Sequence, residues 1–177
     1  MAGHHQPHFH YGMNRLVLLG GPTGVGKSTV LRLLAGRLPK SGVLDADDVW
    51  RVSDDLATAQ RRPNSIGNVV AVMRGFFDAG CEVGILGWVF ARAELYQPVI
   101  DALDDVVDEV QMLYLVADIE ALNGRLTARN DSHLLDYAVG RRAMIEALPF
   151  HRIDTTHLAP GQVADEVCAA IARRTTV

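Results

Sequence analysis

The sequence predicts an α/β fold, a three-layer sandwich in which helices cover both faces of a five-stranded parallel sheet. Short runs of β-branched residues and leucine alternate along the chain with segments whose apolar residues recur at helical spacing. This alternation is typical of right-handed crossovers and a parallel sheet buried on both faces. The chain also contains no internal repeat and no long linker. We therefore expect residues 14–177 to form a single domain.

The strands are predicted where apolar runs are short and are followed by glycine or by acidic residues. The run RLVLLG is typical of a buried parallel strand, and EVQMLYLVA indicates a central one. The run GVLDAD enters a group of acidic residues, CEVGILGWVF is apolar, and HRID is a short final strand. The predicted strands span residues 15–20, 42–47, 81–90, 109–117 and 151–154.

The helices are predicted from apolar spacing and from residues that begin or stop a helix. Val30, Leu31 and Leu34 share one helix face, and Pro39 stops this first helix. Capping residues and a final glycine bound the second helix, and Pro98 is expected to interrupt or kink the third. The predicted helices span residues 28–38, 64–80, 91–104, 118–130, part of 131–148, and 160–174.

The composition is that of a packed globular protein. Of 177 residues, 49% are hydrophobic and 21% charged, and the formal net charge is −4. This charge argues against binding to nucleic acid or to an anionic membrane, which would need a basic face. No apolar run approaches the roughly 20 residues that span a bilayer. Cys81 and Cys168 are expected to be buried thiols in a reducing compartment, which makes the cytoplasm the expected location.

The N-terminal segment differs from the rest of the chain. The stretch MAGHHQPHFHYG contains four of the seven histidines. We interpret residues 1–13 as a tag-like or disordered tail and exclude them from the fold.

The stretch GGPTGVGKST, residues 20–29, carries the most specific signal in the chain. It fits the pattern G-x-x-x-x-G-K-[ST], and it follows a predicted strand and opens a predicted helix. Glycines let the backbone approach a ligand closely, and successive N–H groups with a helix N-terminus attract anions. The sequence therefore predicts that this loop binds the phosphates of a nucleoside triphosphate. The residues expected to bind it are Gly21, Thr23, Gly24, Val25, Gly26, Lys27, Ser28 and Thr29.

A phosphate-binding loop does not by itself name a reaction. A GTPase would need D-x-x-G and N-K-x-D segments, and neither occurs in the chain. A motor ATPase would need an apolar strand ending in an acidic residue, for which Asp118 is the candidate. A small-molecule kinase remains as the third alternative.

The segment VLDADDVW favours the kinase. Asp45 and Asp47 are alternate residues at the mouth of the second strand, so we expect both carboxylates to face one cleft. Together with Ser28, Asp45 is expected to bind Mg²⁺, and Asp47 is expected to accept the proton of an attacking hydroxyl. Asp48 is expected to point away into solvent.

The segments GGPTGVGKST, LDADDVW, RLTAR and IDTTHLAP, in this order and spacing, resemble the small P-loop kinases. These include shikimate kinase, gluconate kinase and chloramphenicol phosphotransferase. The resemblance covers nearly the whole chain after the tail. It implies a P-loop NTPase fold, ATP and Mg²⁺ as cofactors, a small-molecule hydroxyl acceptor, and a monomer or homodimer.

The resemblance also implies roles for residues outside the phosphate-binding loop. Arg125 and Arg129 match arginines that enter a short lid, here around residues 129–140, and steady the transferred phosphoryl group; Arg129 would be catalytic with Asp47 and Lys27. The segment from Asp154 to Pro160, which includes Thr155, matches the loop that wraps the adenine. The third strand departs from the pattern, because it lacks the acidic residue found in many relatives.

The acceptor is expected between the helix at 64–80 and the ends of the second and third strands. The expected lining residues are Trp50, Arg51, Trp88, Phe90 and Arg92. The tryptophans favour an antibiotic, another natural product or a nucleoside, whereas the arginines favour an acceptor with a carboxylate or phosphate, such as a sugar acid. Transfer of the γ-phosphate of ATP to such a hydroxyl is the expected function. The alternative is a regulatory nucleotide-binding protein with little or no phosphotransfer.

Overall fold

The computed structural model describes residues 13–49 and 58–173, and within them the chain forms one parallel sheet. The sheet has five strands in the order β2-β3-β1-β4-β5, which confirms the predicted fold class. The strands are β1 (Arg15–Gly20), β2 (Ser41–Asp45), β3 (Val83–Gly87), β4 (Glu109–Val116) and β5 (His151–Asp154).

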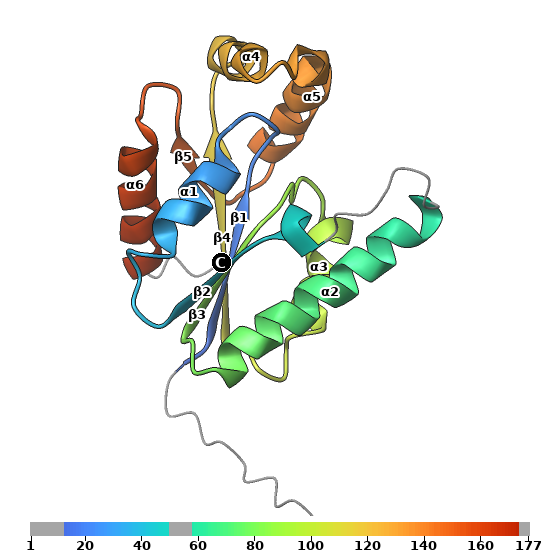
Figure 1. Ribbon diagram of the computed structural model, residues 1–177, viewed down its shortest axis with the longest axis vertical. Helices are drawn as coiled ribbons and strands as arrows, with labels where there is room; N and C mark the ends of the chain where they lie inside the picture. Colours follow the sequence, from blue (N-terminus) through green and yellow to red (C-terminus); the bar gives the residue numbers. More distant parts are fainter. Residues whose placement is uncertain (1–12, 50–57, 174–177) are drawn as a thin grey trace, which may run out of the picture.

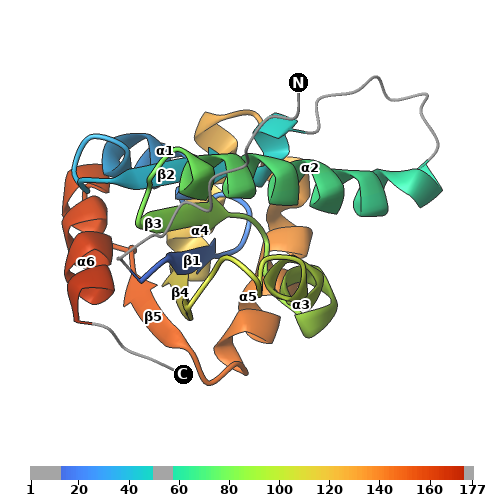
Figure 2. The ribbon, with the colours of Figure 1, turned by 90° about the horizontal axis from the view of Figure 1, so that it is seen from below.

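Helices cover the sheet on both sides. Helices α1 and α6 lie together on one face, and α2 and α3 lie on the other (Figures 1 and 2). The α-helices are α1 (Lys27–Leu34), α2 (Thr58–Asp78), α3 (Ala93–Asp101), α4 (Ile119–Ala128), α5 (Leu135–Glu146) and α6 (Pro160–Ala172). The 3₁₀ helices among the described residues are η1 (Ala46–Val49) and η2 (Ser132–Leu134).

Strand β1 shows how the sheet separates two apolar cores. All six of its residues are buried, and successive side chains point to opposite faces. Leu16 and Leu18 pack in the core under α2 and α3, whereas Val17 and Leu19 pack in the core under α1 and α6. Burial on both faces explains why this strand is a continuous apolar run in the sequence.

Several predicted boundaries are wrong by a few residues. Helix α1 ends at Leu34, α2 begins at Thr58, and β3 ends at Gly87. Helix α3 continues through Pro98, because the carbonyl that loses its hydrogen bond belongs to Glu94 in the first turn.

The two cysteines are free, as expected, but neither is fully buried. Cys81 lies just before β3, and Cys168 lies on the side of α6 that packs against the core. In the part of the chain that the structure describes, no helix combines the length and apolarity that a bilayer-spanning segment requires.

The parallel topology gathers the carboxyl ends of the strands at one edge of the sheet. In the register, Gly87 at the end of β3 lies opposite both Asp45 of β2 and Leu19 of β1. The loop after β1 and the turn after β2 therefore leave the same edge of the sheet, on either side of β3. This is the edge at which open α/β sheets bind ligands.

Candidate functional site

The loop between β1 and α1 has a backbone that only glycine adopts readily. Gly24 and Gly26 have φ angles of 84° and 104°, and Gly26 forms the N-cap of α1. A Cβ atom at Gly24 would lie 3.0 Å from Leu126, so a side chain there would also crowd helix α4. Gly26 supplies no side-chain cap, which leaves the helix N-terminus open to an anion.

The ammonium group of Lys27 lies inside this loop. Its Nζ donates hydrogen bonds to the carbonyl oxygens of Gly21, at 2.7 Å, and Pro22, at 2.9 Å. Burial lowers the pKa of Lys27 to about 8, the negative charges of Asp47 and Asp45 oppose this shift, and Arg129 adds to it. Of the two carboxylates, Asp47 has the larger effect. The site therefore places Asp47 within electrostatic reach of the loop lysine.

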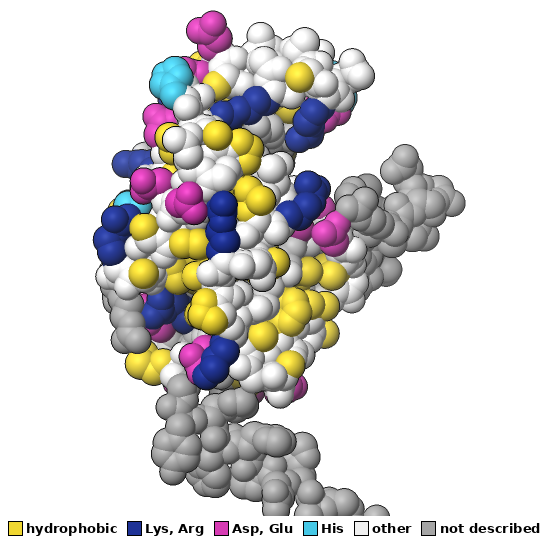
Figure 3. Space-filling view, turned by 60° about the vertical axis from the view of Figure 1, so that its left-hand side comes forward, with side chains coloured by type: hydrophobic (Ala, Val, Ile, Leu, Met, Phe, Trp, Pro, Cys, Tyr) yellow, Lys and Arg dark blue, Asp and Glu magenta, His cyan; other side chains and the backbone are white. Residues whose placement is uncertain are grey.

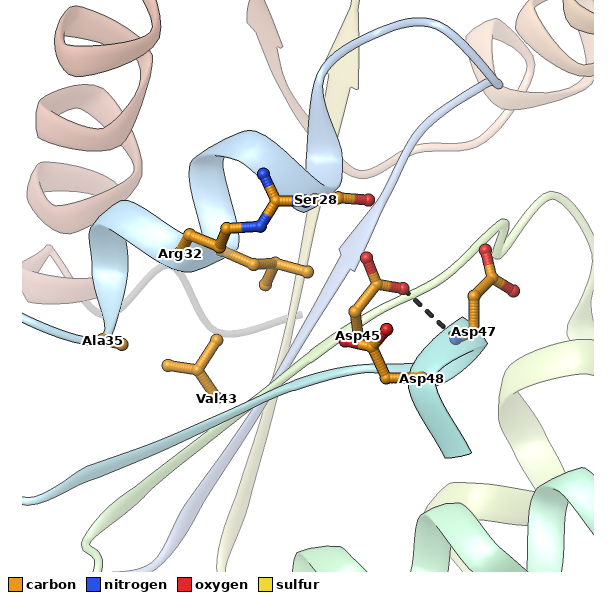
Figure 4. Close-up of a pocket in the computed structure, with 8 residues that line it drawn as sticks. Ser28, Arg32, Ala35, Val43, Asp45, Asp47 and Asp48 are labelled. Atoms are coloured by element: carbon orange, nitrogen blue, oxygen red, sulfur yellow. Dashed lines mark hydrogen bonds between the residues drawn. The ribbon is translucent and has the colours of Figure 1, made fainter. Parts of the chain in front are cut away.

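A polar cavity of about 360 Å³ lies between α1 and the end of β2. In Figure 4 the carboxylates of Asp45 and Asp47 both point toward the side on which α1 begins, and the N–H of Asp47 donates to Oδ1 of Asp45 at 3.2 Å. The lining residues are Ser28, Leu31, Arg32, Ala35, Val43, Asp45, Asp47 and Asp48.

The predicted meeting of Asp45 and Asp47 is found, but its expected cause is wrong. Strand β2 ends at Asp45, and Asp47 belongs to the 3₁₀ helix η1 rather than to an extended segment. The tight turn brings the two side chains to the same cavity. Asp48 is exposed to solvent, as expected, but it does not lie away from the cleft, since it lines this cavity too.

Arg32 lines the same cavity and was not identified from the sequence. It lies four residues after Ser28 on α1, so the two side chains share a helix face. The helical spacing alone could have indicated it. In Figure 3 a notch lies below the end of the molecule that contains α4 and α5. Basic and acidic side chains lie at its edge.

A second, more apolar cavity of about 330 Å³ lies on the other side of the phosphate-binding loop. Thr29 lines this apolar cavity, whereas Ser28 lines the polar cavity that contains the aspartates. The two hydroxyl side chains at the start of α1 therefore face different cavities. The lining residues are Gly24, Val25, Gly26, Thr29, Val30, Arg125, Ala128, Arg129, Thr155, Leu158, Pro160 and Val163. This set contains Arg125, Arg129, Thr155 and Pro160, which the sequence assigned to the nucleotide.

Arg125 joins three segments around the apolar cavity. Its Nη1 donates to the carbonyl of Val25 at 3.3 Å and to Oγ1 of Thr155 at 2.9 Å, and its Nη2 donates to the carbonyls of Thr155 at 2.6 Å and Thr156 at 3.4 Å. A guanidinium with four protein acceptors has few donors left for a phosphoryl group. The geometry favours a role in holding the cavity walls over the predicted contact with the transferred phosphoryl group.

Replacing Arg125 by lysine tests this role. Lysine cannot reproduce the planar fork, so we expect the free energy of unfolding to fall by about 1–3 kcal/mol and nucleotide binding to weaken. Thermal unfolding and calorimetric titration measure the two effects. Arg152→Lys is the matched control, because Arg152 bonds two carbonyls away from both cavities. Equal unfolding curves for Arg125→Lys and Arg152→Lys would contradict the role.

Hydrogen bonds made by two threonines, Thr155 and Thr156, hold the loop after β5. Thr155 is 1% exposed and its hydroxyl accepts from Arg125, whereas Thr156 donates to Asp154 and accepts from the N–H of Asp118. Pro160 is the first residue of α6 and faces the cavity. Asp118, the acidic candidate of a motor ATPase, instead caps α4 by accepting from Ala121 at 2.6 Å.

Of the described residues expected at the acceptor, Trp88 and Arg92 line neither of these two cavities. Trp88 packs partly buried, with its ring edge-on to Phe90, and Arg92 is exposed at the N-cap of α3. Phe90 is completely buried, so its predicted role in lining an acceptor site is wrong. Trp50 and Arg51 lie outside the described residues.

The arginines on α5 have partners away from both cavities. Arg142 donates to the carbonyl of Ala117 at 2.8 Å and pairs with Glu146. Arg141 lies over the ring of Tyr137, 4.9 Å from its centroid. Neither Arg141 nor Arg142 lines one of the two described cavities, whereas Arg125 and Arg129 both line the apolar one.

The residues present suit a hydrated Mg²⁺ ion held by few protein ligands. Within residues 13–49 and 58–173, no cluster of three His, Cys, Asp or Glu side chains is arranged to hold a metal. Ser28 and Asp45 nevertheless offer oxygen atoms to one cavity. Mg²⁺ commonly binds one or two protein oxygens together with phosphate and water.

Comparison with known structures identifies the fold. The chain matches the tunicamycin resistance protein of Deinococcus radiodurans with 22% identity and a TM-score of 0.67, covering 89% of this chain and 95% of that one. It matches a gluconokinase from Sinorhizobium meliloti with 15% identity and a TM-score of 0.64, covering 92% and 94%. The chain has the fold of the small P-loop kinases.

A shikimate kinase structure also has this fold. Shikimate kinase from Acinetobacter baumannii matches with 18% identity and a TM-score of 0.55, covering 92% of this chain and 95% of that one. No family model and no curated protein matches the sequence. The likeness to small P-loop kinases therefore lies in the fold, and the chemistry has to be argued from this chain's own residues.

Proposed function

We propose that the protein is an ATP- and Mg²⁺-dependent phosphotransferase that transfers the γ-phosphate to a hydroxyl group of a small molecule. The observation that carries the proposal is the polar cavity beside the phosphate-binding loop, which Ser28 at the start of α1 lines together with Asp45 and Asp47. A nucleotide-binding site alone needs the lysine. A carboxylate in the adjoining cavity, supplied here by the turn after β2, is what transfer to a hydroxyl adds.

Each residue has a distinct role in the proposed reaction. The loop amides and Lys27 hold the β- and γ-phosphates, and the apolar cavity takes the base. Asp47 accepts the proton of the acceptor hydroxyl as its oxygen attacks the γ-phosphorus. The bond from that phosphorus to the β–γ bridging oxygen breaks, and ADP leaves. Lys27 and Arg129 stabilise the negative charge on the transferred group.

Ser28 and Asp45 would hold Mg²⁺ beside the phosphates. Bound there, the ion would neutralise phosphate charge that the protein's cations leave uncompensated. Asp45 is half-buried and already orients η1 through the N–H of Asp47. This hydrogen bond helps to orient its carboxylate.

The acceptor belongs to one of three chemical groups: an antibiotic or other natural product, a nucleoside, or a sugar acid. The alternative function is nucleotide-dependent regulation with little transfer, because a phosphate-binding loop with its lysine serves nucleotide binding alone as well.

An ADP-release screen separates the two functions. We expect one acceptor class among sugars, sugar acids, shikimate-like acids, nucleosides and hydroxylated antibiotics to raise ADP release above the level with ATP alone. Chelation of Mg²⁺ by EDTA should abolish that increase. If nucleotide binds but no acceptor raises ADP release, the protein is a regulator rather than a kinase.

A further inference from the structure

Helix α4 ends in a turn that returns the chain beneath its last residues. The N–H of Asp131 donates to the carbonyl of Leu126 at 2.8 Å, and the N–H of Asn130 donates to that of Thr127 at 3.0 Å. Asn130 has a φ of 60°, in the left-handed region that this helix-ending motif requires. The motif fixes the backbone of Asp131 two residues after Arg129.

The turn brings the carboxylate of Asp131 to one edge of the Arg129 guanidinium. Oδ2 of Asp131 accepts from Nε at 3.1 Å and from Nη2 at 2.7 Å. A guanidinium has five N–H groups, so the donors of the opposite edge remain for another acceptor. Arg129 lines the apolar cavity in this paired conformation, and its charge contributes to the lowered pKa of Lys27. The pairing is thus compatible with contact between Arg129 and a nucleotide.

We propose that Asp131 is a positioning residue that holds Arg129 in the orientation in which its outer edge meets the terminal phosphate of the nucleotide. The inference rests on the proposed function. Side chains of arginine have many rotamers, and ordering one before the ligand arrives reduces the entropy lost on binding. Asp131 would therefore favour the triphosphate over the diphosphate, because the γ-phosphate is the group that Arg129 is expected to contact.

Binding of a nonhydrolysable ATP analogue (AMPPNP) and of ADP, each with Mg²⁺, tests the inference by calorimetry. The ion pair is partly exposed, since 57% of the Arg129 side chain and 31% of the Asp131 side chain are accessible to solvent. Removing the pair should therefore have a moderate effect on binding. We expect Asp131→Asn to weaken AMPPNP binding about 3- to 5-fold and ADP binding less than 2-fold. Asp131→Glu should restore part of the loss, and unfolding curves should stay unchanged.

A double-mutant cycle separates positioning from a merely structural effect. Arg129→Ala should weaken AMPPNP binding about 10-fold, and adding Asp131→Asn to it should change nothing more. Three results would overturn the inference: wild-type affinity in Asp131→Asn, tighter AMPPNP binding in that variant, or the same further loss in the Arg129→Ala background. If the wild-type protein binds neither nucleotide, the proposed function itself fails as well.

Discussion

Replacement of Asp47 by asparagine should lower the rate of phosphotransfer by about 10²- to 10⁴-fold, the usual contribution of a general base. Asparagine has nearly the same shape but cannot accept the proton of the attacking hydroxyl. Nucleotide affinity should not fall, because the change removes a negative charge near the phosphates. Acceptor-dependent ADP release and calorimetric titration with AMPPNP measure the two quantities on one preparation.

Asp48→Asn is the matched control for this prediction. It makes the same change of charge in the same cavity, one residue further along η1. We expect it to retain most of the transfer rate. Equal losses in the two variants would mean that the charge of the cavity matters and that Asp47 is not the base.

Replacement of Lys27 by methionine should weaken AMPPNP binding about 10- to 100-fold, because a charged hydrogen-bond donor to the phosphates is lost. The folded protein should tolerate the change. Since burial lowers the pKa of Lys27 to about 8, the fold disfavours its charged form, and that form contributes no net electrostatic stability at pH 7.

The comparison of binding with stability makes the Lys27 prediction specific. We expect the melting temperature of nucleotide-free Lys27→Met to lie within a few degrees of the wild-type value. A large drop in melting temperature would show that the hydrogen bonds to Gly21 and Pro22 are the main role of the lysine.

The fold could be predicted from the sequence because strands and helices alternate, and glycine, proline and capping residues mark where many of them begin or end. Strand β1 matches its predicted range, and the glycine pattern of the phosphate-binding loop has the positive φ angles that it requires. Helix ends were less predictable. The spacing of apolar residues continues past Leu34, and tertiary packing rather than local pattern decides where α1 stops.

The roles predicted for the site residues stay predictions, and the structure bears only on where their side chains lie. The sequence indicated Asp45, Asp47 and Ser28, but it could not show that a 3₁₀ turn rather than strand alternation brings the carboxylates together. Arg125 was assigned to the phosphoryl group because the segment RLTAR resembles the lid arginines of the small P-loop kinases. Its four protein acceptors lie in segments distant in the sequence, which no local pattern records.

A crystal structure with AMPPNP and Mg²⁺ tests the central claim most directly. The account predicts that Lys27 leaves the carbonyls of Gly21 and Pro22 to bind the β- and γ-phosphates, with the Asp47 carboxylate facing the γ-phosphate across room for one hydroxyl group. A triphosphate bound away from residues 21–29, or an Asp47 side chain turned away from the γ-phosphate, would contradict it.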